Sequence, residues 1–305
     1  MPETADKQIF PPFLEPGDAI GLITPAGPVT DKDAAKTGIK LIEKWGFKVR
    51  VPDDLERQDY LAGTDEERAK QFIDIWNDNE IKAVLAIRGG YGALRLLPYL
   101  NLKKLAEKPK ILAGFSDITI LLNEITRLTG LITFHSPMLA TLSRSDQQSQ
   151  NSFFRLLAGN FDPVNSKTMQ IMSGGTARGR LIGGNLASLV HLLGTPHEPD
   201  WLNNILVIED VSEAPYKIDR MLTQLKLSGR LEKLAGLIIG TFTGNDGQEE
   251  EWSEVLWKRT QELTGGKIPL WGSFPVGHGA RNITMPMGME VVMNSDKGSL
   301  EFIAP

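Results

Sequence analysis

The alternation of short apolar runs with longer amphipathic stretches constrains the fold of this chain more than any other feature. In the first half, stretches of helical period separate five apolar runs that have the length of buried strands: residues 19–24, 47–51, 83–87, 111–115 and 131–134. Thr64 and Glu67 have the spacing of a capping box, which predicts the start of one helix. Strands that alternate with helices predict parallel βαβ units, and therefore an open parallel sheet with helices on both faces.

A polar segment near the middle divides the chain. Residues 143–152 are all Ser, Asp, Asn, Gln or Arg, and little pattern follows before Gly175. We therefore predict an N-terminal domain over residues 1–145, a linker with one short helix over 146–175, and a C-terminal domain over 176–305. The C-terminal domain is α/β as well, with strands expected at residues 179–182, 205–208, 237–241, 290–293 and 300–303.

Composition excludes several classes of protein. The net charge of −5 argues against a nucleic-acid partner, because phosphates need a basic surface. The absence of cysteine removes disulfide scaffolds, thiolate nucleophiles and cysteine metal sites. Residues 1–12 lack the basic and apolar stretches of a signal peptide, and no apolar segment approaches the roughly 18 residues of a membrane span. We expect a soluble, cytoplasmic protein without a membrane partner. The sequence does not decide whether the protein forms a homodimer.

One serine stands where a nucleophile belongs. In open α/β sheets, ligands collect at the carboxyl ends of the strands. Ser116 follows the strand predicted at 111–115 and runs directly into a helix, so the amide of Asp117 and the helix dipole would favour an oxyanion there. The alternative is that Ser116 only caps the helix, and this segment taken alone favours the cap.

A serine nucleophile needs an adjacent base. The chain has four histidines, and two of them are poorly placed, because one lies in a predicted helix and one in a proline-flanked turn: His191 and His197. His135 follows a predicted strand, and His278 stands between two glycines that let a ligand approach closely. The residues alone divide the role of base evenly between these two. Glu209 ends a buried strand, where it would orient a histidine or form a structural salt bridge, and the residues alone favour the salt bridge.

A glycine-rich segment, Gly89-Gly90-Tyr91-Gly92, follows the strand predicted at 83–87. It could cradle a phosphate or supply amides to an oxyanion hole, but it lacks the G-x-G-x-x-G spacing and the lysine of a P-loop. No H-E-x-x-H or similar spacing suggests a metal site. We expect neither a metal nor a cofactor.

Taken together, these segments resemble the LD-carboxypeptidase family of serine peptidases, which includes the microcin C-immunity peptidases. The likeness extends over nearly the whole chain, and the motifs that carry it keep the family's order and spacing: residues 16–27, Arg88-Gly89-Gly90-Tyr91-Gly92, Gly114-Phe115-Ser116-Asp117, Gly183-Gly184-Asn185-Leu186, Ile208-Glu209-Asp210 and Gly277-His278-Gly279. One departure is Ser136, where many members have glycine, and it puts only the local shape of the pocket in doubt.

The resemblance implies a role for each candidate. Ser116 is the nucleophile, His278 the base, and Glu209 the residue that orients the base, while His135 becomes a residue that lines the pocket. The resemblance also implies that Ser116 lies on the N-terminal α/β domain. The other two members of the triad then lie on a C-terminal α/β domain with a barrel-like sheet, and the site lies at the domain interface.

The family further implies hydrolysis of the L,D-peptide bond that releases D-alanine from a murein tetrapeptide during cell-wall recycling. The partner is then a small peptide, and the amide of Asp117, with one from Gly89 or Gly90, holds the oxyanion. One rival is a microcin-immunity-like peptidase that cuts peptidyl-nucleotides and needs an aromatic platform, for which Trp201 and Trp271 are candidates. The other rival is a non-catalytic two-domain peptide-binding protein, which has no need of a triad.

Overall fold

The computed structural model describes residues 5, 7–53, 57, 59–165, 169–244 and 249–304, with the backbone alone for 249–252. The chain divides into two compact units. The first comprises Met1–Asn160 and Ile283–Pro286, and the second comprises Phe161–Asn282 and Met287–Pro305. The predicted α/β class holds for both units.

A six-stranded sheet forms the centre of the first unit, in the order β12-β5-β4-β3-β1-β2. Neighbouring strands from β2 to β5 run parallel. The strands are β1 (Ala19–Ile23), β2 (Lys48–Arg50), β3 (Ile81–Ala86), β4 (Ile111–Gly114), β5 (Thr133–His135) and β12 (Met285–Met287). β12 comes from the distant end of the sequence, and the sequence did not predict its place in this sheet.

Helices cover both faces of this sheet, because the chain reverses direction across it. The step from β1 to β2 goes one way and the step from β2 to β3 goes back past β1, so right-handed crossovers place the two connecting helices on opposite faces. The contacts agree, since α1 packs with α5, and α2, α3, α4 and η1 pack in a chain of contacts. Their bounds are α1 (Lys32–Lys44), α2 (Asp65–Asn77), η1 (Ala93–Tyr99), α3 (Leu102–Leu105), α4 (Thr119–Thr129) and α5 (Leu139–Leu142).

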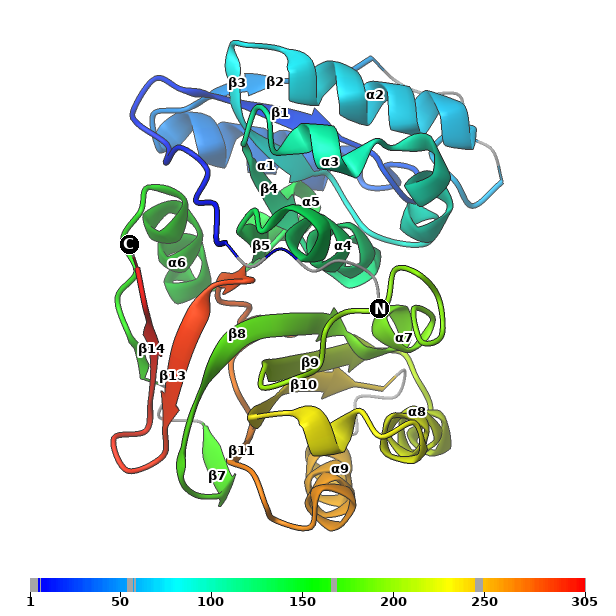
Figure 1. Cartoon of the computed structure of the whole chain (residues 1–305). Helices are drawn as coiled ribbons and strands as arrows, with labels where there is room; N and C mark the ends of the chain where they lie inside the picture. The colour runs from blue at the N-terminus through cyan, green and yellow to red at the C-terminus, as the bar shows by residue number, and fades with distance from the viewer. Residues whose placement is uncertain are drawn as a thin grey trace. The chain divides into compact units, whose positions relative to one another are not determined.

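An eight-stranded sheet forms the second unit, in the order β6-β14-β13-β8-β9-β10-β11-β7. The long strand β8 (Thr176–Asn185) pairs antiparallel with β13 through its first residues and parallel with β9 through its last. The sheet therefore changes direction along β8, whose ribbon curves in Figure 1, and it curls into a half-barrel. The other strands are β6 (Val164–Asn165), β7 (Gln170–Ser173), β9 (Ile205–Val211), β10 (Gly236–Thr243), β11 (Leu270–Gly272), β13 (Glu290–Asn294) and β14 (Ser299–Phe302).

The parallel part of this sheet carries the unit's helices. α8 packs with α9, and α9 packs on β10, as Figure 1 also shows. A cluster of buried residues, among them Leu206, Leu222 and Leu237, fills the space between these helices and the strands. The helices are α7 (Leu186–Val190), α8 (Pro215–Leu227), η3 (Leu231–Lys233) and α9 (Glu249–Thr264).

The range expected to be a linker is largely structured. The polar residues 147–152 open helix α6 (Gln147–Leu157), whose apolar face is buried through Phe153 and Phe154. Phe154 stacks on Trp45 with ring centroids 4.2 Å apart, so α6 packs within the first unit. The polar composition of this stretch reflects the outer face of an amphipathic helix, and the sequence indicated only its last turns.

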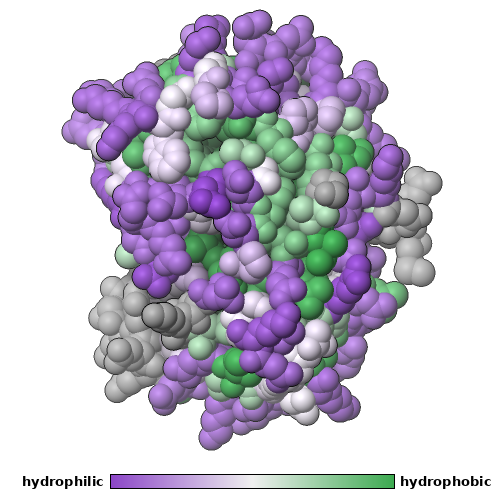
Figure 2. Space-filling view, turned by 90° about the vertical axis from the view of Figure 1, so that its left-hand side faces the viewer, coloured by the Kyte–Doolittle hydropathy of each residue, from purple (hydrophilic) through white to green (hydrophobic). Residues whose placement is uncertain are grey.

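Hydrophilic residues make up most of the face shown in Figure 2, and hydrophobic residues gather in patches between them. Among the described residues, no helix combines the length and the hydrophobicity needed to cross a membrane.

The predicted capping box is confirmed. The backbone N–H of Glu67 donates to the Thr64 hydroxyl at 3.2 Å, and the N–H of Thr64 donates to the Glu67 carboxylate at 2.8 Å. We expect Thr64→Ala to lower the free energy of unfolding by about 1 kcal/mol, because α2 loses the acceptor for one of its first amides. Denaturant titration measures this change. Thr37→Ala is the control, since Thr37 lies in the middle of α1 and its hydroxyl donates to the carbonyl of Asp33 one turn earlier. Equal stability of the two variants would contradict a capping role.

Candidate active site

Ser116 stands on a strained turn between β4 and α4. Its φ is +63°, in the left-handed region that residues with a side chain rarely adopt. Such a backbone costs about 1–3 kcal/mol and persists only where the surroundings impose it. The short helix η2 (Ser116–Ile118) and then α4 follow directly, so the half-buried hydroxyl projects from a sharp strand-to-helix turn.

The alternative role of Ser116 as a helix cap is wrong. The N-cap of η2 is Phe115 and the N-cap of α4 is Ile118, and neither position makes a side-chain capping hydrogen bond. The strained conformation of Ser116 therefore has no capping function to explain it. Strained backbone of this kind is typical of a strand-to-helix turn that presents a functional side chain.

The glycine-rich loop after β3 lies against Ser116. A Cβ on Gly89 would come within 2.9 Å of the Ser116 Cβ, 3.0 Å of its Oγ and 3.5 Å of the Asp117 nitrogen. No side chain fits there, so the backbone itself approaches the hydroxyl. The carbonyl of Gly89 accepts a hydrogen bond from the N–H of Gly27 at 3.0 Å, which fixes the start of the loop.

Glu209 and His278 form a pair in the second unit. The imidazole Nδ1 and the carboxylate Oε2 are 2.6 Å apart, and the Glu209 side chain is fully buried. Gly277 makes this approach feasible, because its φ is +122° and a Cβ there would come within 2.8–2.9 Å of Glu209. With Nδ1–H donating to the carboxylate, Nε2 of the neutral ring is the nitrogen that accepts a proton.

Electrostatics at this pair favour a protonated imidazole. Burial opposes the charged form and is the largest single effect, but the charge and hydrogen bond of Glu209 and the charge of Asp210 together outweigh it. The pKa of His278 is therefore raised above its ordinary value of 6.5. Among the described residues the other oxygen of Glu209 has no hydrogen-bond donor, so His278 is the main group that neutralises this buried carboxylate.

Asp210 and Asn185 support the pair from the neighbouring strand ends. Asp210 accepts from the Asn185 amide at 3.0 Å and from the backbone N–H groups of Ala187 and Val211, both at 2.8 Å. Burial, and then the charge of Glu209, raise the pKa of Asp210 to about 6. Asn185 caps α7 by accepting from Ser188. The sequence analysis assigned no role to Asn185, although its place at the end of a strand was a usable signal.

The remaining histidine and tryptophan candidates have structural environments that do not point to a direct role in the site. His135 is buried in the first unit, edge-on to Phe115 with centroids 5.7 Å apart, and His191 is an exposed residue at the end of α7. Both tryptophans considered as an aromatic platform are buried and use their indole N–H within the fold. Trp201 donates to Glu198 at 2.8 Å, and Trp271 donates to Ser295 at 3.0 Å. Neither offers a free face for a nucleobase.

A cavity of about 420 Å³ lies in the first unit. Its lining includes Thr24 and Ile87, which directly follow β1 and β3, together with the basic residues Lys32 and Arg57. These two strands flank the point where the chain reverses direction across the sheet, which is where open α/β sheets form ligand crevices. In the described part of the chain, no group of three or more His, Cys, Asp and Glu side chains could hold a metal ion.

The close packing at Gly277 generates a prediction. In Gly277→Ala the added methyl would collide with Glu209 and break its hydrogen bond to His278. We expect the pKa of His278, followed by an NMR titration, to fall toward 6.5. Gly46→Ala is the matched control, because its φ is +90° but nothing lies within 4 Å of the added methyl. Both variants carry backbone strain, and only the first should change the titration. A Gly277→Ala protein that titrates like the wild type would refute the coupling.

Comparison with known proteins identifies the family. Residues 20–136 match the LD-carboxypeptidase N-terminal domain, and residues 178–293 match the LD-carboxypeptidase C-terminal domain. The chain is 36% identical to the probable murein peptide carboxypeptidase of Bacillus subtilis, and the alignment covers 93% of this chain and 91% of that protein.

Solved structures agree with this assignment. Muramoyltetrapeptide carboxypeptidase from Oxalobacter formigenes has a TM-score of 0.80 and 31% identity, over 93% of this chain and 97% of that one. MccF, the microcin C7 self-immunity protein of Escherichia coli, solved with glutamyl sulfamoyl guanosine, has a TM-score of 0.87 and 26% identity, over 97% and 98%. The chain belongs to the LD-carboxypeptidase family and is a peptidase.

Proposed function

We propose that this peptidase is a serine carboxypeptidase that releases D-alanine from murein tetrapeptides by hydrolysing an L,D-peptide bond. The observation that carries the proposal is the strained Ser116 hydroxyl, held against the backbone of Gly89 and next to the start of a helix. The names of the Bacillus and Oxalobacter relatives support a murein peptide as the substrate. We further propose that the reaction takes place in the cytoplasm, on peptides recovered from the cell wall.

The proposed mechanism joins three side chains. Nε2 of His278 takes the proton of Ser116 while Oγ attacks the carbonyl carbon, and Glu209 stabilises the resulting imidazolium. The amide of Asp117, with one from Gly89 or Gly90, binds the oxyanion of the tetrahedral intermediate.

The tetrahedral intermediate then collapses to an acyl-enzyme, which water hydrolyses. The C–N bond breaks, His278 gives its proton to the leaving amine, and D-alanine departs from an acyl-Ser116 ester. A water molecule, deprotonated by His278, then attacks the ester, and the proton returns to Oγ as the tripeptide leaves.

The microcin-type activity is the second candidate, because the MccF structure contains an aminoacyl sulfamoyl nucleoside. Two observations favour the murein substrate. Identity is higher to the murein carboxypeptidases than to MccF, at 36% against 28% in the sequence comparison and 31% against 26% in the structure comparison. In addition, Trp201 and Trp271 are buried and hydrogen-bonded, so neither could stack on a base. A purely binding function is disfavoured, since it would not require strain at Ser116 or a carboxylate–imidazole pair.

Ser116→Ala tests the nucleophile. We expect kcat with a murein tetrapeptide to fall by about 10³-fold or more, with folding and binding kept, since only the hydroxyl is lost. Mass spectrometry of released D-alanine gives the rate. Ser145→Ala is the control, because the Ser145 hydroxyl donates to the nearby carbonyl of Thr141, within the same unit. Wild-type turnover by Ser116→Ala would reject serine catalysis, and turnover of an aminoacyl sulfamoyl nucleoside alone would select the second candidate.

The pH profile tests the base. His278 must be neutral to accept a proton, so its raised pKa places the acid limb of kcat/KM above pH 6.5, with the rate falling as pH drops through it. Glu209→Gln should move this limb to lower pH, because the neutral amide no longer stabilises the imidazolium, and should lower kcat by roughly 10²- to 10⁴-fold. His135→Gln should leave the limb in place. A limb that moves only in His135→Gln would assign the base to His135.

A further inference from the structure

Arg68 is a fully buried arginine for which neither the fold nor the proposed triad accounts. It lies in the first turn of α2, and its side chain is 0% exposed. Buried charges are costly unless they are paired and hydrogen-bonded, so its placement needs a reason. Its partners provide one, because they belong to separate loops at the carboxyl end of the sheet.

The guanidinium binds three backbone carbonyls and one carboxylate. Nη1 donates to the carbonyl of Gly92 at 3.0 Å and to that of Pro25, and Nε donates to the carbonyl of Gly63 at 3.2 Å. Nη2 pairs with Asp65. Arg68 thus ties together the loop after β1, the segment before α2 and the glycine-rich loop after β3.

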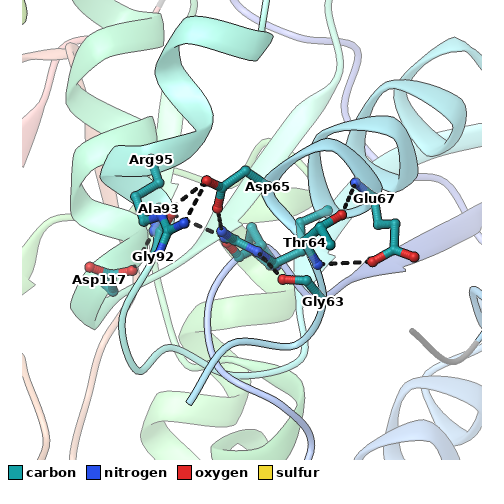
Figure 3. A network of polar contacts seen from close by, with 10 residues as sticks. Gly63, Thr64, Asp65, Glu67, Gly92, Ala93, Arg95 and Asp117 are labelled. Atoms are coloured by element: carbon teal, nitrogen blue, oxygen red, sulfur yellow. Dashed lines mark hydrogen bonds and ion pairs between the residues drawn. The ribbon is translucent and has the colours of Figure 1, made fainter. Parts of the chain in front are cut away.

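The contact with Gly92 reaches Ser116 through one peptide group. The carbonyl of Gly92 and the N–H of Ala93 belong to the same peptide unit. Arg68 holds the carbonyl, and the Asp117 carboxylate accepts from the Ala93 N–H at 2.7 Å. Figure 3 shows Ala93 facing Asp117, with Gly92 beside it. One rigid peptide plane is therefore held at both ends, by α2 on one side and by the neighbour of Ser116 on the other.

The start of the loop is held by the same set of segments. The N–H of Gly27 donates to Gly89, and Pro25, two residues earlier, is bound by Arg68. The backbone between these anchors contains Gly90, whose φ of +117° is open to glycine but not to residues with a side chain. The charges of this group balance. Asp65 pairs with both Arg68 and Arg95, the latter at 2.8 Å, and Asp117 supplies a second carboxylate for the two guanidinium groups.

We infer that Arg68 is a positioning residue for this peptidase: it fixes the loop Gly89–Gly92 and, through the Gly92–Ala93 peptide, the amide of Asp117, so that the oxyanion donors stay aligned with Ser116. This inference rests on the proposed serine mechanism. It concerns the alignment of the reacting groups and not the identity of the peptide.

The test uses the full chain and two readouts. One is kcat and KM for release of D-alanine from a murein tetrapeptide. The other is the rate at which an alkyl fluorophosphonate labels Ser116, with the P–F bond broken and the Oγ–P bond formed. Labelling depends on the nucleophile and the oxyanion donors but not on the natural substrate. A wild-type protein that is labelled but releases no D-alanine would refute the proposed substrate alone, and labelling would still test Arg68.

In Arg68→Met we expect kcat and the labelling rate each to fall by about 10²-fold, because misplacement of reacting groups by about 1 Å costs that much, while KM changes by less than about threefold. Arg68→Lys should stay low, since one ammonium cannot hold carbonyls on three segments in place of a planar fork. Asp65→Asn should show a smaller loss, because Arg68 keeps its carbonyl partners.

Arg127→Met is the matched control. Arg127 is a second buried arginine of the first unit, with a side chain 5% exposed, and it pairs with Glu124 at 2.7 Å in the same i,i+3 arrangement. Its loss should lower Tm while kcat and labelling per folded molecule stay within about twofold of the wild type. The inference is overturned if Arg68→Met keeps wild-type labelling per folded molecule, or if its only defect is in KM. Should Arg68→Met not fold, wild-type labelling by Arg68→Lys overturns it equally.

Discussion

The close approach of the Gly89 backbone to Ser116 is the constraint on which the rest of the first unit depends. A single added carbon at Gly89 would overlap the serine side chain, so the loop can lie there only as bare backbone. Bare backbone has no side chain to anchor it, and the anchors must come from elsewhere. Gly27 binds Gly89 at one end, Arg68 and Asp117 bind the Gly92–Ala93 peptide at the other, and the strained φ of Ser116 completes the arrangement. Strain at Ser116 is tolerable because neighbouring segments over-determine its conformation.

In the second unit a glycine also allows a close approach, but there the approaching group is a charged side chain and not backbone. Here glycine at position 277 makes room for a charge, so that Glu209 and His278 can meet in a buried place. The imidazole of His278 offsets the cost of burying the Glu209 carboxylate. The hydrogen bond from Asn185 to Asp210 holds the neighbouring strand ends together beside this pair. Asp210 in turn adds its charge to the field that raises the pKa of His278.

Period and position in the sequence were enough to predict the strands of the parallel sheet, the capping box at Thr64 and the residues that stand at strand ends. They could not predict Arg68, because an arginine in the first turn of an amphipathic helix has the pattern of a solvent-exposed residue. Its burial depends on carbonyls from loops far away in the sequence. The sequence also failed to predict most of α6, because its polar outer face resembled a linker. It did not predict the place of β12, because its partner β5 lies some 150 residues earlier. Local signals specify local elements, and long-range partners are decided by packing.

The return of Ile283–Pro286 to the first unit makes the two units topologically inseparable. The chain passes from one unit to the other after residues 160, 282 and 286, so no single cut yields two complete modules. A fragment that ended at residue 160 would lack β12 and would leave β5 as an open sheet edge, whose unpaired amides and carbonyls invite association with other chains. The fragment would also lose the hydrogen bond that the N–H of Thr284 donates to the Ser152 hydroxyl at 3.1 Å. In evolutionary terms, the unit that contains Ser116 could not be exchanged between proteins without a short sequence that lies just after His278.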